Sequence, residues 1–357
     1  MPVGSSRIGR LVSLLSRRRV GLFLCVRMTN IRYLTGFSGS DGALLVSPDG
    51  ATLVTDGRYA EQSRQEVCGA EVAITDRKWD EVLKAIRRLR PARIGYESRH
   101  LTVEIFRRLS RRMAEKWVAL ADPVEGLRMR KEEGEIRAME RAAVAASGAL
   151  LAVLSKGYRG RTESEVAADL EREMKAQGAE DASFRAIVAS GARGALPHAV
   201  PTGARIGPVD AVVIDFGARR GGYCSDETVT LLPERPLRGL GKAFDAVRKA
   251  QEAGIRAIRP GVPCVEVDAK VRESLDRSGY LKYFVHSTGH GVGLDVHERP
   301  SLSPRSKDRL REGMVVTVEP GVYLPGVGGV RLEDMVRVAG TRGERITYLP
   351  KTISRLV

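Results

Sequence analysis

Two pairs of carboxylates in this 357-residue chain are each expected to meet across a β-hairpin; they are Asp215, Asp226, Glu319 and Glu333. A two-residue turn at Arg220-Gly221 would place Asp215 opposite Asp226. A three-residue loop at Pro325-Gly326-Val327 would place Glu319 opposite Glu333 in the same way. Opposed strand residues share a face, with Cβ atoms about 5 Å apart. Two ionised carboxylates at that distance repel by roughly 3 kcal/mol at an effective dielectric of about 20. Two such pairs in apolar, β-rich segments therefore predict a site that gathers cations.

The histidines lie close to these carboxylates in the sequence. Three of the five fall within the twelve residues from His286 to His297. The spacing of His286 and His290 is that of helical zinc peptidases, but no Glu follows His286 and glycines interrupt the segment. An extended or looped segment is therefore expected, with imidazoles turned toward the carboxylates. A single histidine is more often a core or surface residue, whereas three between two carboxylate hairpins favour a metal site.

The segments that carry these residues resemble the pita-bread metallopeptidases, and within them the branch of Xaa-Pro dipeptidases (prolidases) and aminopeptidase P. The matching segments are Ile214-Asp215-Phe216-Gly217, Gly222-Tyr223-Cys224-Ser225-Asp226-Glu227-Thr228, His286-Ser287-Thr288-Gly289-His290-Gly291, Val318-Glu319-Pro320-Gly321 and Val330-Arg331-Leu332-Glu333-Asp334. The similarity covers most of the chain. One segment alone is a weak signal, but the full set in this order is very specific.

The resemblance implies a role for each residue. The five metal ligands of the family correspond to Asp215, Asp226, His290, Glu319 and Glu333. The residues on the substrate side correspond to His198 and His297 as catalytic histidines, and to His286, Tyr323 and Arg331 as substrate-binding or supporting side chains. In this scheme Asp226 and Glu333 bridge two ions, Asp215 completes one, and His290 and Glu319 complete the other. Glu319 also shuttles a proton to the leaving amine, and the catalytic histidines stabilise the oxyanion and position the scissile carbonyl.

This ligand set limits the choice of metal. Oxygen ligands with one imidazole suit divalent manganese, cobalt, iron or zinc. No cysteine belongs to the set, which excludes a structural zinc site of the thiolate type. Two divalent ions balance the charge of four carboxylates, and a water bridging them would be deprotonated near neutral pH to give the attacking hydroxide. We expect manganese or cobalt, with zinc or iron as alternatives.

Two positions depart from the family pattern. The family usually has Asp-x-Thr-Arg-Thr where this chain has Asp226-Glu227-Thr228-Val229-Thr230, so an arginine is replaced by Val229. Arg193 stands where a small polar residue is common. We expect both changes to touch the substrate or the residues that support the ligands, and so to alter substrate range more than metal binding.

Residues 1–122 alternate helix and strand and carry no catalytic constellation. Strands are predicted at 21–26, 42–46 and 52–55, and helices at 7–19, 58–67, 79–89 and 102–113. The segment Asn30–Phe37 resembles the N-terminal domain of creatinases and prolidases. A linker at 122–126 would then lead into a catalytic domain at 123–357.

The second domain contains a faint internal repeat. Thr162–Ala168 aligns with Pro263–Ala269 at an offset of 101, and the same offset carries Gly178 onto Gly279, where a glycine would end a helix. Each half is followed by one carboxylate hairpin. A pseudo-twofold pairing of two helix–helix–hairpin units would bring the hairpins together, as the pita-bread resemblance also implies. The expected fold class is therefore α/β (α+β).

Composition limits the partners and the compartment. The net charge of +15 comes with only 5% aromatic residues and no basic run interleaved with aromatics, which disfavours nucleic acid. An arginine-rich composition spread over solvated surfaces explains the charge better than an anionic partner. Four scattered cysteines without paired spacing indicate reduced thiols in a cytoplasmic protein. No secretory signal is evident, and no apolar stretch is expected to approach the roughly 20 residues of a membrane span.

The favoured function is a peptidase that cleaves between an N-terminal residue and proline. Creatinase shares the scaffold but lacks the ligands, and methionine aminopeptidase lacks an N-terminal domain of this type. A catalytically idle pita-bread module that binds protein or nucleic acid is the alternative from another class, but such a module has no need for four clustered carboxylates. Dipeptides and longer peptides remain equally open as substrates, since pocket depth depends on loops and on a second subunit in an expected homodimer.

Overall fold

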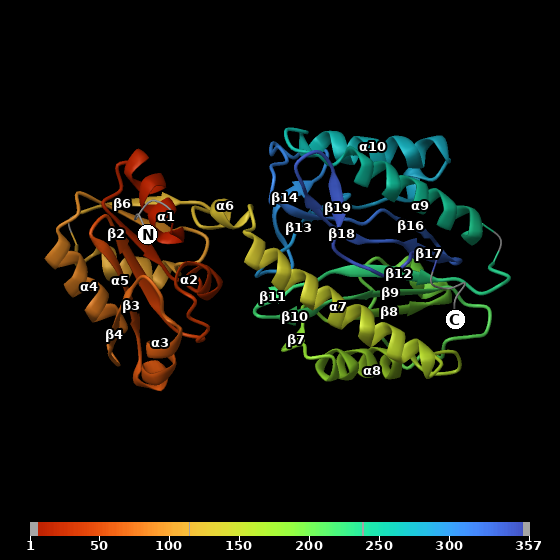
Figure 1. Ribbon diagram of the computed structural model, residues 1–357, viewed down its shortest axis with the longest axis horizontal. Coiled ribbons are helices and arrows are strands. Elements are labelled where there is room, and N and C mark those ends of the chain that lie inside the picture. Colours follow the sequence, from red (N-terminus) through yellow and green to blue (C-terminus); the bar gives the residue numbers. More distant parts are fainter. Residues whose placement is uncertain (1–5, 114, 238, 353–357) are drawn as a thin grey trace. The chain divides into compact units, whose positions relative to one another are not determined.

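The computed structural model describes residues 6–113, 115–237 and 239–352. The chain divides into two compact units, Met1–Arg128 and Met129–Val357 (Figure 1). Every residue predicted to take part in chemistry belongs to the second unit.

The first unit is built on a six-stranded mixed sheet in the order β4-β3-β2-β1-β5-β6, with α4 and α5 packed on it. The strands are β1 (Leu22–Cys25), β2 (Ala43–Ser47), β3 (Gly50–Thr55), β4 (Glu71–Ile74), β5 (Arg93–Glu97) and β6 (Lys116–Leu120). The helices are α1 (Arg7–Arg17), α2 (Met28–Thr35), α3 (Ala60–Glu66), α4 (Lys78–Leu89), α5 (Val103–Ser110) and α6 (Glu125–Arg128). The predicted strands and helices are all present, although the helix expected at 102–113 already ends at Ser110.

The second unit contains two helix pairs, which lie on opposite sides of the strands in Figure 1. The helices are α7 (Glu133–Ser155), α8 (Glu163–Ala176), α9 (Leu240–Ala257) and α10 (Cys264–Arg277). α7 packs on α8, and α9 packs on α10. The predicted repeat is confirmed, because the N-caps of α8 and α10, Thr162 and Pro263, are 101 residues apart, as are Gly178 and Gly279 after their ends.

Four small sheets fill the space between the helix pairs, with the orders β12-β9-β8, β11-β10-β7, β14-β13-β15-β18-β19 and β16-β17. The strands of the first half are β7 (Asp181–Ala182), β8 (Ile187–Ser190), β9 (Val212–Phe216), β10 (Ala218–Arg220), β11 (Tyr223–Cys224) and β12 (Glu227–Leu231). Those of the second half are β13 (Gly289–Gly291), β14 (Glu298–Leu302), β15 (Val315–Val318), β16 (Gly321–Leu324), β17 (Gly328–Arg331), β18 (Asp334–Val338) and β19 (Gly343–Arg345).

The register of the first carboxylate hairpin differs from the prediction. Arg220 pairs with Tyr223, so the turn lies at Gly221-Gly222 rather than at Arg220-Gly221. Both glycines have positive φ (+61° and +80°), which a tight turn between twisted strands requires at its two central positions. Asp215 is consequently paired with Thr228 and not with Asp226. Asp226 lies just before β12 and two residues before Thr228, so alternation along an extended chain places it on the same face as Asp215.

The register of the second carboxylate hairpin is confirmed. Gly321 pairs with Arg331, and Val318 pairs with Asp334, which is the predicted alignment in both ladders. Glu319 and Glu333 fall between these ladders, where Pro320 has no N–H to donate. The strand pairing therefore opens at the residues expected to bind metal.

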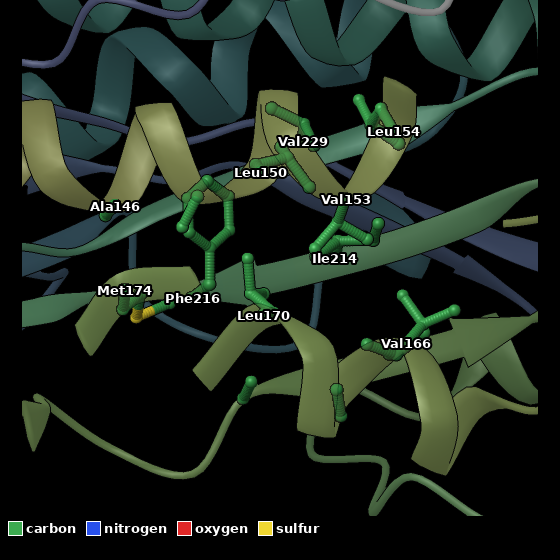
Figure 2. Close-up of a cluster of buried hydrophobic side chains, with 14 of the residues drawn as sticks. Ala146, Leu150, Val153, Leu154, Val166, Leu170, Met174, Ile214, Phe216 and Val229 are labelled. Carbon is green, nitrogen blue, oxygen red and sulfur yellow. The ribbon is translucent and has the colours of Figure 1, made fainter. Parts of the chain in front are cut away.

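The core under the first hairpin determines which side chains face the site. α7 and α8 cover β8, β9 and β12, and alternate residues such as Ile214 and Phe216 point into this core (Figure 2). Asp215 between them must point to the other side of the sheet. Val229 also lies in this core. The expectation that the Val229 departure touches the substrate or the residues that support the ligands is therefore wrong, because strand alternation turns this side chain away from the site.

The properties of α7 differ from the expectation that no segment is long and apolar enough to span a membrane. Its 23 residues are long and apolar enough, by length and composition, to cross a membrane, although no segment was expected to reach that length. About 61% of its most apolar window is buried inside the protein, much of it in the core with α8. Packing against the sheet accounts for this hydropathy, as it does for other core helices.

A buried ionic network lies on the strands that carry the site. Lys351 is 2.6 Å from Glu227 and 3.0 Å from Asp334, and all three side chains are at most 8% exposed. Glu227 and Asp334 directly follow Asp226 and Glu333 in the sequence. Because neighbouring residues in an extended strand point to opposite faces, Lys351 binds the two strands from behind the predicted ligands.

We predict that Lys351→Met lowers the free energy of unfolding by about 3 kcal/mol, since it removes the cation paired with the buried Glu227, whereas Asp334 keeps its ion pair with Arg345. Urea denaturation followed by circular dichroism would measure this. Lys270→Met is the matched control, because Lys270 and Glu273 form an exposed surface pair that should contribute no measurable stability. A loss no larger than that of the control would show that the network does not stabilise the unit.

Candidate metal centre

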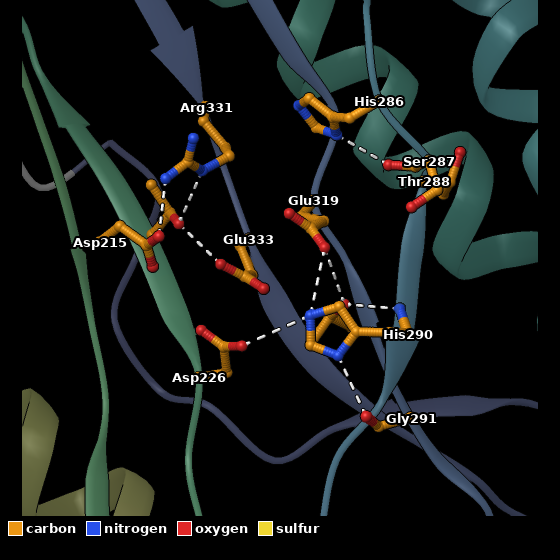
Figure 3. Close-up of polar contacts among 12 residues, drawn as sticks. Asp215, Asp226, His286, Ser287, Thr288, His290, Gly291, Glu319, Arg331 and Glu333 are labelled. Atoms are coloured by element: carbon orange, nitrogen blue, oxygen red, sulfur yellow. Dashed lines mark hydrogen bonds and ion pairs between the residues drawn. The ribbon is translucent and has the colours of Figure 1, made fainter. Parts of the chain in front are cut away.

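The structure brings the five predicted ligands together. Each comes from a separate part of the second unit: Asp215 from β9, Asp226 from between β11 and β12, His290 from β13, Glu319 from the end of β15, and Glu333 from between β17 and β18. Their side chains point toward one another in Figure 3. The two helix–helix–hairpin units thus contribute carboxylates to one shared space.

His290 lies close to two of the carboxylates. Its Nε2 is 3.4 Å from Glu319 Oε1 and 3.6 Å from Asp226 Oδ2. Its Nδ1 is 3.0 Å from the carbonyl oxygen of Gly291 and can donate a hydrogen bond to it. That bond places the proton on Nδ1 and leaves the Nε2 lone pair directed at the carboxylates, as in a metal-bound imidazole. One ligand atom each from Asp226, His290 and Glu333 lies within 4.8 Å of the others, so the three could hold a metal ion.

Burial makes these carboxylates hard to ionise without a cation. It raises the pKa of Asp226 and Glu333 well above the usual range, and the charges of the neighbouring carboxylates add to the shift. Burial likewise raises the pKa of Glu319 to about 8. Burial, followed by the proximity of His297, lowers the pKa of His290 to about 4, which keeps the imidazole neutral and able to coordinate.

The residues fit a divalent cation. Asp215 Oδ2 accepts a hydrogen bond from Arg331 at 2.7 Å, but its other oxygen, Oδ1, is buried and has no hydrogen-bond partner in the part of the chain that the structure describes. A buried acceptor is almost always satisfied by a protein group, water or an ion. A metal beside Asp215 would satisfy Oδ1 and relieve the repulsion among the carboxylates.

Two threonines, which the sequence analysis did not single out, hold the ligands in place. Thr228 donates its hydroxyl to Glu333 Oε2 at 2.6 Å, and the Glu333 amide donates to the Thr228 carbonyl at 3.0 Å. Thr317 donates to Glu319 Oε1 at 3.3 Å and accepts the amide N–H of His290 at 3.0 Å. The strand registers place both threonines beside ligands, but only once the correct pairing is known.

The five predicted ligands line a cavity of about 540 Å³. His198, His286, His297 and Arg331 line it together with the ligands. The rings of His290 and His297 lie 4.2 Å apart. His286 Nε2 is 2.9 Å from the hydroxyl of Tyr323, which is itself buried. Burial lowers the pKa of His286 to about 4 and also lowers the pKa of His297. Neutral imidazoles are therefore available beside the space for a substrate.

Arg331 is engaged by protein groups on several sides. It donates to Asp215 at 2.7 Å, to the Tyr323 hydroxyl at 2.9 Å and to the Pro197 carbonyl at 3.0 Å. A further bond runs to Thr228 at 3.2 Å. Arg331 thus orients one predicted ligand and also anchors the residue that precedes His198.

Arg193 lies outside the cavity lining, contrary to the expectation that it touches substrate or ligand supports. It forms an ion pair with the fully buried Glu163 at 3.0 Å and donates to the Val200 carbonyl at 2.7 Å. Glu163 in turn accepts the amide N–H groups of Ser190 and Thr202. The departure at this position therefore braces the loop on which His198 lies.

Part of the lining is not predicted by the sequence. Phe184, Arg185, Ile187, Val200 and Pro201 contribute to the wall of the cavity. Nothing in their types or spacing marks them, because it is the pairing of Ile187 with Asp215 that brings this segment to the site.

Two known protein families match this chain. The creatinase/prolidase N-terminal domain matches residues 7–130, and metallopeptidase family M24 matches residues 137–339, more than half of the chain. The chain belongs to metallopeptidase family M24. The predicted resemblance and the predicted fold class, an N-terminal creatinase-like domain followed by a pita-bread domain, are confirmed.

Individual M24 relatives match over nearly the whole length. An Xaa-Pro dipeptidase of Pyrococcus furiosus is 34% identical over 342 residues, which cover 96% of this chain and 97% of that protein. The structure of an Xaa-Pro dipeptidase from Bacillus anthracis is 38% identical with a TM-score of 0.94, covering 96% and 97% of the two chains. The structure of an X-Pro aminopeptidase from Thermotoga maritima is 36% identical with a TM-score of 0.89, covering 97% and 98%.

For this M24 chain we expect exhaustive chelation to lower the melting temperature and added Mn²⁺ or Co²⁺ to restore it. A ligand that binds only the folded state at 100 times its Kd stabilises by about 2.7 kcal/mol. Differential scanning fluorimetry would measure the shift. Asp226→Asn should abolish it, whereas Glu171→Gln, at an exposed position on α8, should retain it. A metal-dependent shift that survives in Asp226→Asn would remove this residue from the ligand set.

Proposed function

We propose that this chain is a peptidase that uses two divalent metal ions to hydrolyse the bond between an N-terminal residue and proline. The observation that carries the proposal is the convergence of four carboxylates and His290 on one cavity. Relatives named Xaa-Pro dipeptidase and X-Pro aminopeptidase, similar over nearly the whole chain, support the substrate class.

The same cluster suggests how two ions would be held. Asp215, Asp226, His290, Glu319 and Glu333 would together hold the ions. The oxygen-rich set favours manganese or cobalt, with zinc and iron as alternatives. Bound ions would lower the pKa of a water molecule and polarise the scissile carbonyl.

The chain's own residues would manage the proton and the substrate. Glu319, held by Thr317, is placed to take a proton from the attacking water and to pass it to the leaving amine. His198 and His297 in the cavity lining would donate hydrogen bonds to the carbonyl oxygen as negative charge develops on it. His286, in contact with Tyr323, would shape the wall beside the proline ring.

An idle binding module is the weaker alternative. Clustering four carboxylates, of which Asp226 and Glu333 are buried, costs folding energy, and a module without a metal gains nothing from that cost. The positive net charge is the only feature that favours an anionic macromolecular partner. A cytoplasmic homodimer without nucleic-acid or membrane partners remains our prediction for the assembly.

We predict that Glu319→Gln lowers kcat at least 100-fold, because the glutamine amide cannot accept the proton of the attacking water. His198→Ala should also lower kcat, yet keep the metal content of the wild type, because His198 acts on the substrate. Single-turnover kinetics and elemental analysis of the same preparations would separate the two effects. Metal loss in His198→Ala would show that His198 is a ligand.

We predict at least a tenfold preference in kcat/KM for Xaa-Pro over the matching Xaa-Ala peptide. The bond before proline has no N–H, whereas Xaa-Ala would bury an unpaired N–H against the lining at a cost of about 1–3 kcal/mol. Release of the N-terminal residue from both peptides, with added Mn²⁺, Co²⁺ or Zn²⁺, gives the ratio and tests the proposed function. Equal rates on the two peptides would indicate an aminopeptidase of broader range, and absence of cleavage in every metal would contradict the proposal.

A further inference from the structure

Arg185 brings an uncommitted positive charge to the cavity. It contributes to the lining beside His198 and Asp215, and its side chain is exposed. Within residues 6–113, 115–237 and 239–352, its guanidinium has neither a hydrogen bond nor an ion pair. An arginine with free donors in the wall of a cavity is available to a ligand.

The strand pairing explains why Arg185 faces the site. Ile187, at the start of β8, is paired with Asp215 in the ladder. Ala186 and Val188 point into the core under α7 and α8, so the alternate residues 185 and 187 face the other side of the sheet, where the ligands are. Two residues of extended chain cover about 7 Å, so Arg185 lies within a side chain's reach of the ligand cluster.

The other guanidinium in the lining is already committed. Arg331 is 5% exposed at its side chain and donates to Asp215, Tyr323 and the Pro197 carbonyl. The carboxylates of the cavity would be balanced by divalent ions under the proposed function. In the lining, Arg185 then carries a positive charge that is not paired with any group in the described part of the chain.

A guanidinium in this position is suited to one chemical group. Its planar set of N–H donors matches the two oxygens of a carboxylate, and such charge-assisted pairs are stronger than neutral hydrogen bonds.

We propose that Arg185 binds a carboxylate of the substrate and thereby determines which Xaa-Pro peptides this chain prefers. The inference rests on the proposed function. Two substrate groups carry this chemistry: the C-terminal carboxylate of a dipeptide and the side chain of an acidic N-terminal residue. The first would make the chain a dipeptidase, and the second would select peptides that begin with Asp or Glu.

Two matched substrate pairs separate these sources with the metal-loaded enzyme. Ala-Pro and Ala-Pro-amide differ only in the C-terminal carboxylate, and Asp-Pro-amide and Asn-Pro-amide differ only in the side-chain carboxylate. Arg185→Gln should lower kcat/KM about tenfold for the charged member of one pair, mainly through KM, and change its uncharged member less than twofold. Arg185→Lys should recover part of the loss, because it restores the charge without the planar donor set.

The control variant is Arg259→Gln. Arg259 is exposed, lies outside the cavity lining, and has no side-chain partner in the described part of the chain. Its removal changes the net charge by the same amount and should leave both pairs unaffected.

The outcomes distinguish this inference from the function on which it rests. A lower kcat/KM for the charged peptide of the first pair would show that Arg185 binds the C-terminal carboxylate. A lower kcat/KM for the charged peptide of the second pair would show that it binds an acidic side chain. Equal losses for the charged and uncharged members of both pairs, or no loss in either, would overturn the role of Arg185 while Xaa-Pro cleavage stands. If the wild type cleaved none of the four peptides, the proposed function would be wrong and the inference would fall with it.

Discussion

Mutual repulsion among four clustered carboxylates, two of them buried, is the constraint that organises the second unit. Asp226 and Glu333 are almost fully buried, and their raised pKa values express the cost of ionising them there. The fold opposes this repulsion with hydrogen bonds from Thr228 and Thr317 and with an ion pair from Arg331. These contacts orient the carboxylates, but they do not supply enough positive charge to balance them, which is why the arrangement calls for cations.

Strand alternation uses the same two segments for a second purpose. The residue after each of Asp226 and Glu333 is another carboxylate, and it faces the opposite side, where Lys351 pairs with both and Arg345 also pairs with Asp334. On one face of these segments the carboxylates are thus paired with cationic side chains of the protein. On the other face they are available to bind metal. The pseudo-twofold repeat explains the symmetry of this arrangement. Each helix–helix–hairpin unit contributes one predicted ligand and the carboxylate that follows it in the sequence.

The sequence predicted the ligand cluster through residue type and order. It predicted the second hairpin correctly because the loop expected at 325–327 is the one that joins its two strands. The first hairpin was misaligned because Arg220-Gly221 and Gly221-Gly222 are both acceptable turns, and only the backbone shows that both glycines have positive φ. The positions of Val229 and Arg193 were misjudged for a related reason. A family pattern marks a position as unusual, but only packing shows that Val229 faces a core and that Arg193 binds Glu163.

The bond between Thr228 and Glu333 spans 105 positions of the chain, and that between Lys351 and Glu227 spans 124. Contacts so distant in sequence form only after long loops have closed, which makes folding slow and cooperative. A partly folded chain would therefore hold scattered carboxylates with little affinity for any ion. This unit should therefore bind metal only after its long-range contacts have formed, so a bound ion indicates a fully folded molecule.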